Sequence, residues 1–264
     1  MEPGSTFNAV ASAYDAHRAG YPAALFDDLK IIAGLAPGDH ALEIGCGAGQ
    51  ATTGLLGLGL DVTAIDPGLA LVAHARQRFA GTDEVAKVRF AVSRFEDWSA
   101  ADESFRLIAA AQSWHWLDPK SSFAKVARLT APGGSLAIFG HTPRWSAKLM
   151  AHLEPVYRTL APEIWAPPGE NWYLPEGPIR DIIAASGAFE AAECRSYAWS
   201  RRHKPQSFTA YLGTVSRTNS LPTDRREAFL AAVEAALPAD VDTDWVSTLY
   251  VARRRISITT AIAP

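Results

Sequence analysis

One stretch decides the fold, Leu42-Glu43-Ile44-Gly45-Cys46-Gly47-Ala48-Gly49-Gln50, in which an apolar run ends in three glycines at alternate positions. The apolar residues before the glycines indicate a buried strand, and a helix-like segment follows them. Glycine lets the backbone adopt positive φ angles and lets a ligand approach the main chain closely. The stretch therefore predicts a strand, a cofactor-binding loop and a helix, as in a doubly wound α/β domain.

The rest of the first half alternates between strand and helix patterns. Apolar runs bounded by turn residues predict five strands, at 41–44, 61–65, 88–92, 107–111 and 135–139. Helical periodicity lies before and between them, beginning with a segment opened by Pro22 and closed by Gly34. Short strands separated by helices favour parallel pairing through right-handed crossovers.

Composition limits the class of protein. The chain has 264 residues, of which 48% are hydrophobic and 20% are charged, and its net charge is −3. This composition is typical of soluble enzymes and gives no overall attraction for nucleic acid. The short basic clusters at 201–204 and 253–255 are interpreted as solvated faces. Two cysteines, no signal-peptide pattern and no apolar stretch of membrane-spanning length predict a cytoplasmic protein without a membrane segment.

The glycine loop departs from the nicotinamide fingerprint. Gly-x-Gly-x-x-Gly would require glycine at position 50, where Gln50 stands, so a pyrophosphate would be poorly bound. Asp66 ends the second predicted strand, where an acidic side chain can accept hydrogen bonds from both ribose hydroxyls. That role is common to nucleoside cofactors, so Asp66 does not by itself separate them.

Three further motifs accompany the acidic Glu-x-Gly-x-Gly-x-Gly loop. They are Tyr14-x-x-x-Arg18-x-x-Tyr21-Pro22, the stretch from Ala109 to Asp118 that contains Gln112-Ser113-Trp114-His115-Trp116, and Ala131-Pro132-Gly133-Gly134. Together they resemble class I S-adenosylmethionine-dependent methyltransferases of the small-molecule branch, which includes trans-aconitate methyltransferase and enzymes of the ubiquinone and menaquinone biosynthesis type. The resemblance covers residues 7–140 well and is only general beyond His141.

The resemblance implies a Rossmann-like doubly wound sheet of seven strands with an antiparallel last strand, in which Phe189–Trp199 and Thr248–Ile258 form the closing pair. It implies S-adenosylmethionine as cofactor, with Tyr14 and Arg18 at its methionine portion and Phe95 with Glu96 at its adenine. A guanidinium suits the methionine carboxylate because it binds bidentately. The cofactor-binding residues expected are Tyr14, Arg18, Glu43, Gly45, Cys46, Gly47, Gly49, Asp66, Pro67, Phe95, Glu96 and Gln112.

Methyl transfer from a sulfonium needs in-line attack, and proximity alone can contribute about 7–11 kcal/mol. A base is needed only if the acceptor keeps its proton at neutral pH. His115 is then the best-placed candidate, since general-base action contributes about 10²–10⁴-fold. The alternative is that His115 packs between its two tryptophan neighbours with both nitrogens satisfied.

Residues 141–178 change in character, because they are rich in proline and tryptophan. Surface linkers seldom carry so many aromatics, so this segment is interpreted as a lid or substrate-pocket insertion in a single methyltransferase domain spanning 1–264, with residues 205–237 as a helical insertion between the last two strands. The substrate residues expected are Trp116, Arg144, Trp145, Trp172 and Tyr173. His141 and His152 lack matching partners at metal-ligand spacing, so no metal site is predicted.

Three alternatives to a small-molecule methyltransferase remain open. A nicotinamide-dependent oxidoreductase is disfavoured by Gln50, and a non-catalytic S-adenosylmethionine-binding protein by the intact loop motif. A nucleic-acid or protein methyltransferase is disfavoured by the lack of an Asn/Asp-Pro-Pro-Tyr motif after the fourth strand. The expected partner is a small-molecule substrate, with no nucleic acid and no membrane, and the expected assembly is a monomer or a homodimer.

Overall fold

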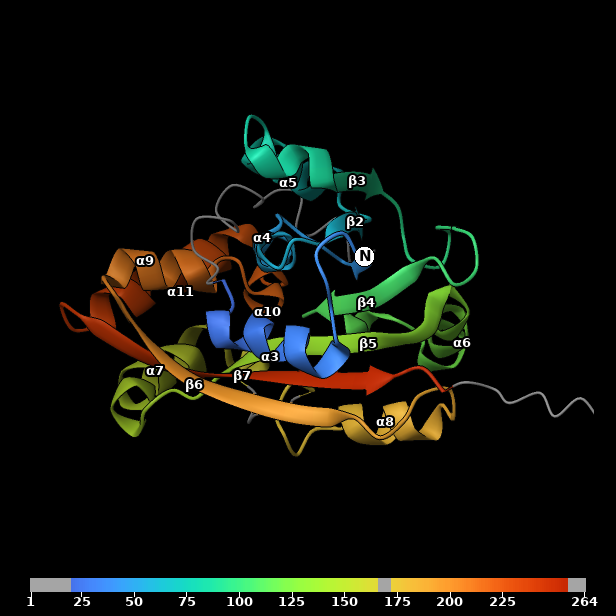
Figure 1. The fold of residues 1–264 in the computed structure, drawn as a ribbon. Helices are drawn as coiled ribbons and strands as arrows, with labels where there is room; N and C mark the ends of the chain where they lie inside the picture. The colour runs from blue at the N-terminus through green and yellow to red at the C-terminus, as the bar shows by residue number, and fades with distance from the viewer. Residues whose placement is uncertain (1–19, 166–171, 256–264) are drawn as a thin grey trace, which may run out of the picture.

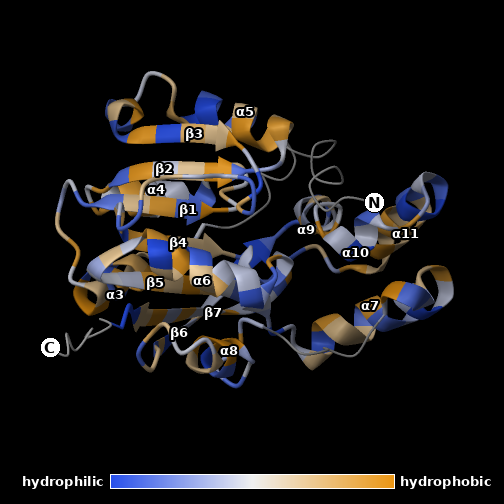
Figure 2. Cartoon of the chain, turned by 90° about the vertical axis from the view of Figure 1, so that its right-hand side faces the viewer, coloured by the Kyte–Doolittle hydropathy of each residue, from blue (hydrophilic) through white to orange (hydrophobic). Residues whose placement is uncertain are grey.

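A computed structural model describes residues 20–165 and 172–255. Seven strands form one sheet in the order β3-β2-β1-β4-β5-β7-β6, which runs from top to bottom in Figure 2. The strands are β1 (His40–Ile44), β2 (Asp61–Asp66), β3 (Val88–Val92), β4 (Phe105–Ala111), β5 (Thr130–Pro143), β6 (Glu193–His203) and β7 (Val241–Arg253). The predicted doubly wound sheet is confirmed.

The first five strands are parallel, and β7 pairs antiparallel with both β5 and β6. Four of the five residues of β1 are buried, as expected for a central parallel strand covered on both faces. The apolar runs in the sequence therefore report burial on both sides of the sheet.

Helices cover both faces of the sheet. One core packs against α3, α4 and the end of α5, and the other packs against α6 and α8. The bounds of these helices are α3 (Ala23–Ala33), α4 (Gln50–Gly57), α5 (Leu69–Phe79), α6 (Pro119–Leu129) and α8 (Ile179–Ala185). The short 3-10 helices are η1 (Asp83–Lys87), η2 (Trp114–Trp116) and η3 (Pro162–Ile164). Figure 1 shows α3 and α8 lying against different parts of the sheet.

The antiparallel closing pair is confirmed, but its bounds differ from the prediction of 189–199 and 248–258. β7 begins at Val241, seven residues earlier than expected, because Val241, Thr243 and Trp245 alternate buried with exposed Asp242 and Asp244 along β6. The carboxylates interrupt the apolar pattern in the sequence, but they lie on the exposed face of the strand.

A third core lies beyond the sheet. It joins α7, α9 and α11 to the outer ends of β6 and β7, around residues such as Leu153, Phe208 and Phe229. The helices are α7 (Ala147–Leu160), α9 (Pro205–Leu212), α10 (Ser216–Asn219) and α11 (Thr223–Ala236). Figure 2 shows all four on the side toward which the parallel strands point, where ligands bind in open α/β sheets.

Within the described ranges, no helix combines the length and the apolar character that crossing a membrane requires.

Candidate functional site

The glycine loop takes the backbone conformations that only glycine adopts easily. The φ angles of Gly45, Gly47 and Gly49 are 71°, 56° and 89°. The loop is fixed to β2, because Ile65 O accepts from the backbone N–H groups of Gly45 and Cys46 at 2.8 and 3.0 Å. The chain then enters α4 directly from Gly49, which is its N-cap residue.

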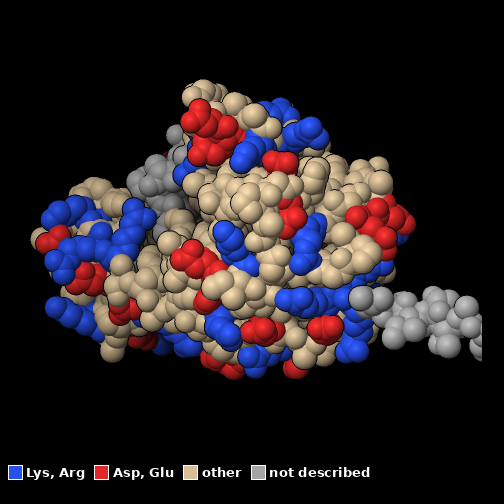
Figure 3. All heavy atoms as spheres, in the orientation of Figure 1, with Lys and Arg blue, Asp and Glu red and all other residues tan. Residues whose placement is uncertain are grey.

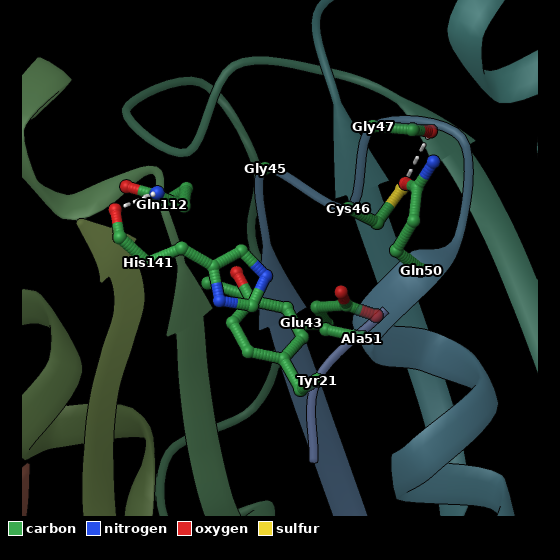
Figure 4. Close-up of a pocket in the computed structure, with 10 residues that line it drawn as sticks. Tyr21, Glu43, Gly45, Cys46, Gly47, Gln50, Ala51, Gln112 and His141 are labelled. Atoms are coloured by element: carbon green, nitrogen blue, oxygen red, sulfur yellow. Dashed lines mark hydrogen bonds between the residues drawn. The ribbon is translucent and has the colours of Figure 1, made fainter. Parts of the chain in front are cut away.

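A cavity lies beneath this loop, at the carboxyl ends of β1, β4 and β5. It holds about 410 Å³ of space, part of it open to solvent. Figure 4 shows residues that are far apart in the sequence, such as Tyr21, Glu43 and His141, converging on it. They are Tyr21, Glu43, Gly45, Cys46, Gly47, Gln50, Ala51, Ala111, Gln112 and His141.

Glu43 is the fully buried carboxyl group of this cavity. Its Oε2 accepts from the Thr52 hydroxyl at 2.6 Å, while its Oε1 is buried without a hydrogen-bond partner among the described residues. Burial raises the pKa of Glu43 to about 8, although the Thr52 hydrogen bond lowers it. A buried acceptor without a donor is costly, so Oε1 is a place for a ligand that brings a donor or a positive charge.

Cys46 is buried beside Glu43. Burial raises the pKa of its thiol well above the usual value, and the carboxyls of Glu43 and Asp66 act in the same direction. The thiol therefore stays protonated at neutral pH and contributes shape to the cavity instead of a nucleophile.

Asp66 ties the glycine loop to the next loop. Its Oδ2 accepts from Gly47 N at 3.0 Å and its Oδ1 accepts from Gly68 N at 2.7 Å. The side chain is 8% exposed, and burial raises its pKa against the lowering effect of these two hydrogen bonds. Pro67, the next predicted residue, is exposed between the two loops.

Gln112 directly follows β4 in a conformation that is uncommon for a residue with a side chain, with φ of 56°. Its backbone N–H donates to Phe139 O at 2.9 Å, and its side-chain Nε2 donates to His141 O at 2.7 Å. Residues held in sparsely populated conformations gather at functional sites, and Gln112 lines the cavity.

The predicted adenine residues are not among those that line the cavity. Phe95 is 3% exposed within the core against α6, where the Lys125 ammonium lies 4.9 Å from the centre of its ring. Glu96 forms an ion pair with Arg94 at 3.5 Å at the surface.

His115 lies in a group of aromatic rings just past the end of β4. Its Nδ1 is 2.9 Å from Oη of Tyr173, and its ring lies 4.8 Å from Trp116 and 6.5 Å from Trp172. Trp116 is 50% exposed and Tyr173 is 4% exposed. Burial lowers the pKa of His115 to about 4, so the imidazole is neutral at pH 7.

The remaining predicted substrate residues point elsewhere. Arg144 pairs with Glu176 at 3.3 Å on the surface, and its side chain is 52% exposed. Trp145 packs edge-on against Phe208 in the third core. The aromatic residues of the segment 141–178 are thus divided between the third core, around α7, and the group of aromatic rings at His115.

Tyr14 and Arg18 lie outside the described residues. Sequence reasoning did not select Tyr21, Gln50, Ala51, Ala111 and His141 for this site, although all five line the cavity. The rings of Tyr21 and His141 stack with centroids 4.1 Å apart, and Nδ1 of His141 lies 2.9 Å from Ser247 Oγ. The position of His141 at the end of β5 was the available signal, since ligand contacts gather at strand ends.

In residues 20–165 and 172–255, no group of three or more His, Cys, Asp or Glu side chains is arranged to hold a metal ion.

Comparison with known proteins locates the same region. A family model described as a methyltransferase domain matches residues 42–138, which run from β1 through β5 and include the glycine loop, Asp66 and Gln112. An uncharacterized methyltransferase of Mycobacterium tuberculosis is 27% identical over 249 residues, covering 93% of this chain and 92% of that protein.

Solved structures agree in fold. The structure of a putative type II methyltransferase from Anaeromyxobacter dehalogenans has a TM-score of 0.64 and 26% identity, covering 89% of this chain and 97% of that one. A phosphoethanolamine N-methyltransferase of Haemonchus contortus in complex with phosphomonomethylethanolamine and S-adenosylhomocysteine has a TM-score of 0.55 and 18% identity, covering 94% of this chain and 58% of that one. The similarity extends beyond the family match to the closing strands β6 and β7.

Proposed function

We infer that this chain is a class I S-adenosylmethionine-dependent methyltransferase, and we propose that it methylates a small organic acceptor that binds beside the carboxyl ends of β4 and β5. The observation that supports this most strongly is the cavity beneath the glycine loop, which contains a buried acceptor on Glu43 and is also lined by the rings of Tyr21 and His141.

The residues present fit the cofactor. Oε1 of Glu43 is a buried acceptor that the ammonium group of a methionine moiety would satisfy. Gly45 cannot carry a side chain in this loop, since a Cβ there would lie 2.5 Å from Cβ of Ser113. We propose that Glu43, Gly45, Cys46, Gly47, Gly49 and Gln112 hold the methionine side, that Asp66 and Pro67 lie at the ribose, that Phe95 and Glu96 support the adenine side, and that Tyr14 and Arg18 complete the site.

In this reaction the chain's own residues bind the cofactor and orient the two reactants. When bound, S-adenosylmethionine supplies a methyl carbon attached to a positively charged sulfur, which is a good leaving group. Glu43 provides a negative charge that complements the ammonium group of the cofactor. The glycine loop, itself held by its contacts with β2, would fix the position of the cofactor. Most of the acceleration then comes from holding the acceptor in line, an effect that reaches about 7–11 kcal/mol at its upper end.

Cofactor affinity is expected to rise with pH up to about 8, because the neutral Glu43 carboxyl must lose its proton before it pairs with an ammonium group. The rise approaches about tenfold for each pH unit below that value. Calorimetric titration with S-adenosylhomocysteine between about pH 6 and pH 9 measures it. Glu43→Gln should bind more weakly and lose this part of the pH dependence, and the exposed Glu190→Gln should keep it. Identical slopes for Glu43→Gln and the native protein would exclude this role.

The acceptor side is proposed from the aromatic group around His115. Trp116, Trp172 and Tyr173 surround this imidazole, and planar aromatic surfaces suit small organic molecules. We propose residues 141–178 as the part of the chain that covers the acceptor, 7–140 as the cofactor-binding core and 205–237 as a helical insertion that supports the cover. Arg144 and Trp145 belong to the cover in this proposal.

Nucleic acid is a poor candidate for the acceptor. The basic cluster at 201–204 is offset by ion pairs, Arg202 with Asp242 and Lys204 with Asp240, each at 2.7 Å. On the face drawn in Figure 3, Lys and Arg side chains are interspersed with Asp and Glu. Both cysteines are free thiols, which agrees with the cytoplasmic location that we propose. We also propose a monomer or a homodimer.

A labelled methyl donor tests the proposal. The protein, incubated with methyl-labelled S-adenosylmethionine and pooled metabolites that include dicarboxylic acids, quinone precursors and phenols, is expected to label a molecule of low mass. Label that appears only in added protein or nucleic acid would contradict it. Cofactor binding without label in any fraction would favour a non-catalytic role, and tight nicotinamide binding would favour the oxidoreductase.

A further inference from the structure

The two carboxyl oxygens of Glu43 lie in different environments. Oε2 accepts from the hydroxyl of Thr52 at 2.6 Å, and Oε1 is buried without a hydrogen-bond partner among the described residues. Glu43 and Thr52 are both 0% exposed. The hydroxyl therefore holds one oxygen of the carboxyl group and leaves the other as the acceptor that Glu43 can offer to a ligand in the cavity.

The hydroxyl of Thr52 behaves differently from that of its neighbour Thr53. Both residues lie in the first turn of α4, but the Thr53 hydroxyl donates to Gly49 O at 3.1 Å. A bond to the carbonyl four residues earlier is usual for a threonine in a helix. The Thr52 hydroxyl instead reaches out of its helix to Glu43 on β1. Its direction is therefore set by a contact between two elements and not by the helix alone.

The surroundings of Glu43 oppose its charge. The ionisable side chains that share the cavity with it or act on its charge are Tyr21, Cys46, His141 and Asp66. None of the described residues that line the cavity is a lysine or an arginine. Burial raises the pKa of Glu43 to about 8, the Thr52 hydrogen bond opposes this rise, and the carboxyl of Asp66 adds to it. Among these three influences, the hydroxyl is the one that favours the ionised carboxylate.

We propose that Thr52 is a positioning residue of the cofactor site, whose hydroxyl holds Oε2 of Glu43, leaves Oε1 for the ammonium group of the methionine moiety, and favours the charged carboxylate that this group needs. A carboxylate only accepts hydrogen bonds, so a donor fixed on Oε2 stabilises the charged form over the neutral one. Thr52 is not among the residues that line the cavity, so it acts through Glu43. The inference rests on the proposed function, because it needs a cofactor whose ammonium group meets Glu43.

The effect of Thr52 on the charge of Glu43 can be measured in the protein without cofactor. The carboxyl carbon of Glu43 is followed by NMR in ¹³C-labelled protein from about pH 6 to about pH 10, and Glu43→Gln identifies its signal. Thr52→Val keeps the shape of the side chain and removes the hydroxyl. Its titration midpoint should lie about one pH unit above the native midpoint, because hydrogen bonds to charged groups are stronger than those to neutral groups. Thr52→Ser restores a hydroxyl and should titrate like the native protein.

Thr53→Val is the matched control for this titration. It removes a hydroxyl from the adjacent, exposed residue of the same helix and should leave the midpoint of Glu43 unchanged. If Thr52→Val does not fold, Thr52→Ala also lacks the hydroxyl and carries the same expectation. A midpoint in the variant without the hydroxyl that equals the native midpoint would overturn the inference, whether or not the protein binds the cofactor.

Calorimetric titration with S-adenosylhomocysteine gives the second test. With midpoints at about pH 8 in the native protein and about pH 9 in Thr52→Val, the variant should bind about tenfold more weakly at about pH 7, but only about twofold more weakly at about pH 9. Disturbed packing alone would weaken binding by the same factor at both pH values, and that result would overturn the inference. Failure of the native protein to bind S-adenosylhomocysteine at any pH would instead overturn the proposed function, and with it the part of the inference that concerns the cofactor.

Discussion

Gly45→Ala is expected to remove measurable cofactor binding and to destabilise the fold. The alanine Cβ would lie 2.5 Å from Cβ and 3.0 Å from Oγ of Ser113, whose hydroxyl bonds to Ile44 O and cannot move freely. The residue would also have to keep a φ of 71°. The conformation costs about 1–2 kcal/mol and the overpacking about 1–3 kcal/mol, so we expect a loss of roughly 2–5 kcal/mol in the free energy of unfolding.

Gly81→Ala is the matched control for this variant. Gly81 has a φ of 78°, but nothing lies within 4 Å of the Cβ that it would gain. Gly81→Ala should lower the free energy of unfolding only by the conformational cost, about 1–2 kcal/mol, and should bind the cofactor like the native protein. Denaturant unfolding and calorimetric titration with S-adenosylhomocysteine measure both quantities. If Gly45→Ala unfolds and binds like Gly81→Ala, the close packing of the loop on Ser113 does not shape the site.

Asp66→Ala is expected to weaken cofactor binding by about 1–3 kcal/mol, roughly 5- to 150-fold, with a smaller effect on folding. The substitution removes the carboxylate proposed for the ribose hydroxyls, and it leaves the backbone N–H groups of Gly47 and Gly68 without their acceptor. Both effects act on the loops that border the cofactor.

Asp66→Asn separates the two effects, because an amide keeps one acceptor oxygen for a loop N–H and loses the charge. It should bind with an affinity between those of the native protein and Asp66→Ala in calorimetric titration. The exposed Asp83→Ala serves as the control for a lost surface carboxylate and should bind like the native protein. Unchanged affinity in Asp66→Ala would remove this residue from the site.

The sheet could be predicted because its signals are local. The glycine loop follows an apolar strand directly, and both the turn and the burial are encoded within nine residues, so β1, the loop and α4 follow from the sequence. The antiparallel pair was predicted through the family resemblance, with β7 placed too late because Asp242 and Asp244 interrupt its apolar pattern.

The sequence could predict only those site residues that directly follow a strand. Gln112 and the glycines reach the cavity because they directly follow strands. Arg144 and Trp145 lie three and four residues beyond His141, yet one pairs with Glu176 and the other packs against Phe208. Such partners are far apart in the chain, and residue spacing shows which face a side chain takes but not which neighbour it meets.

Tyr173 illustrates the same limit. Spacing marked it as one aromatic among several, and only the fold brings its hydroxyl within 2.9 Å of Nδ1 of His115. The side chain that contacts His115 in this way is therefore 58 positions away in the chain.

The most direct test is a crystal structure of the protein with S-adenosylhomocysteine. We predict that the ligand occupies the cavity beneath the glycine loop, with its ammonium group on Oε1 of Glu43 and its ribose hydroxyls on Asp66. A ligand bound elsewhere, or a cavity that stays filled by the protein's own side chains at saturating ligand, would contradict the account.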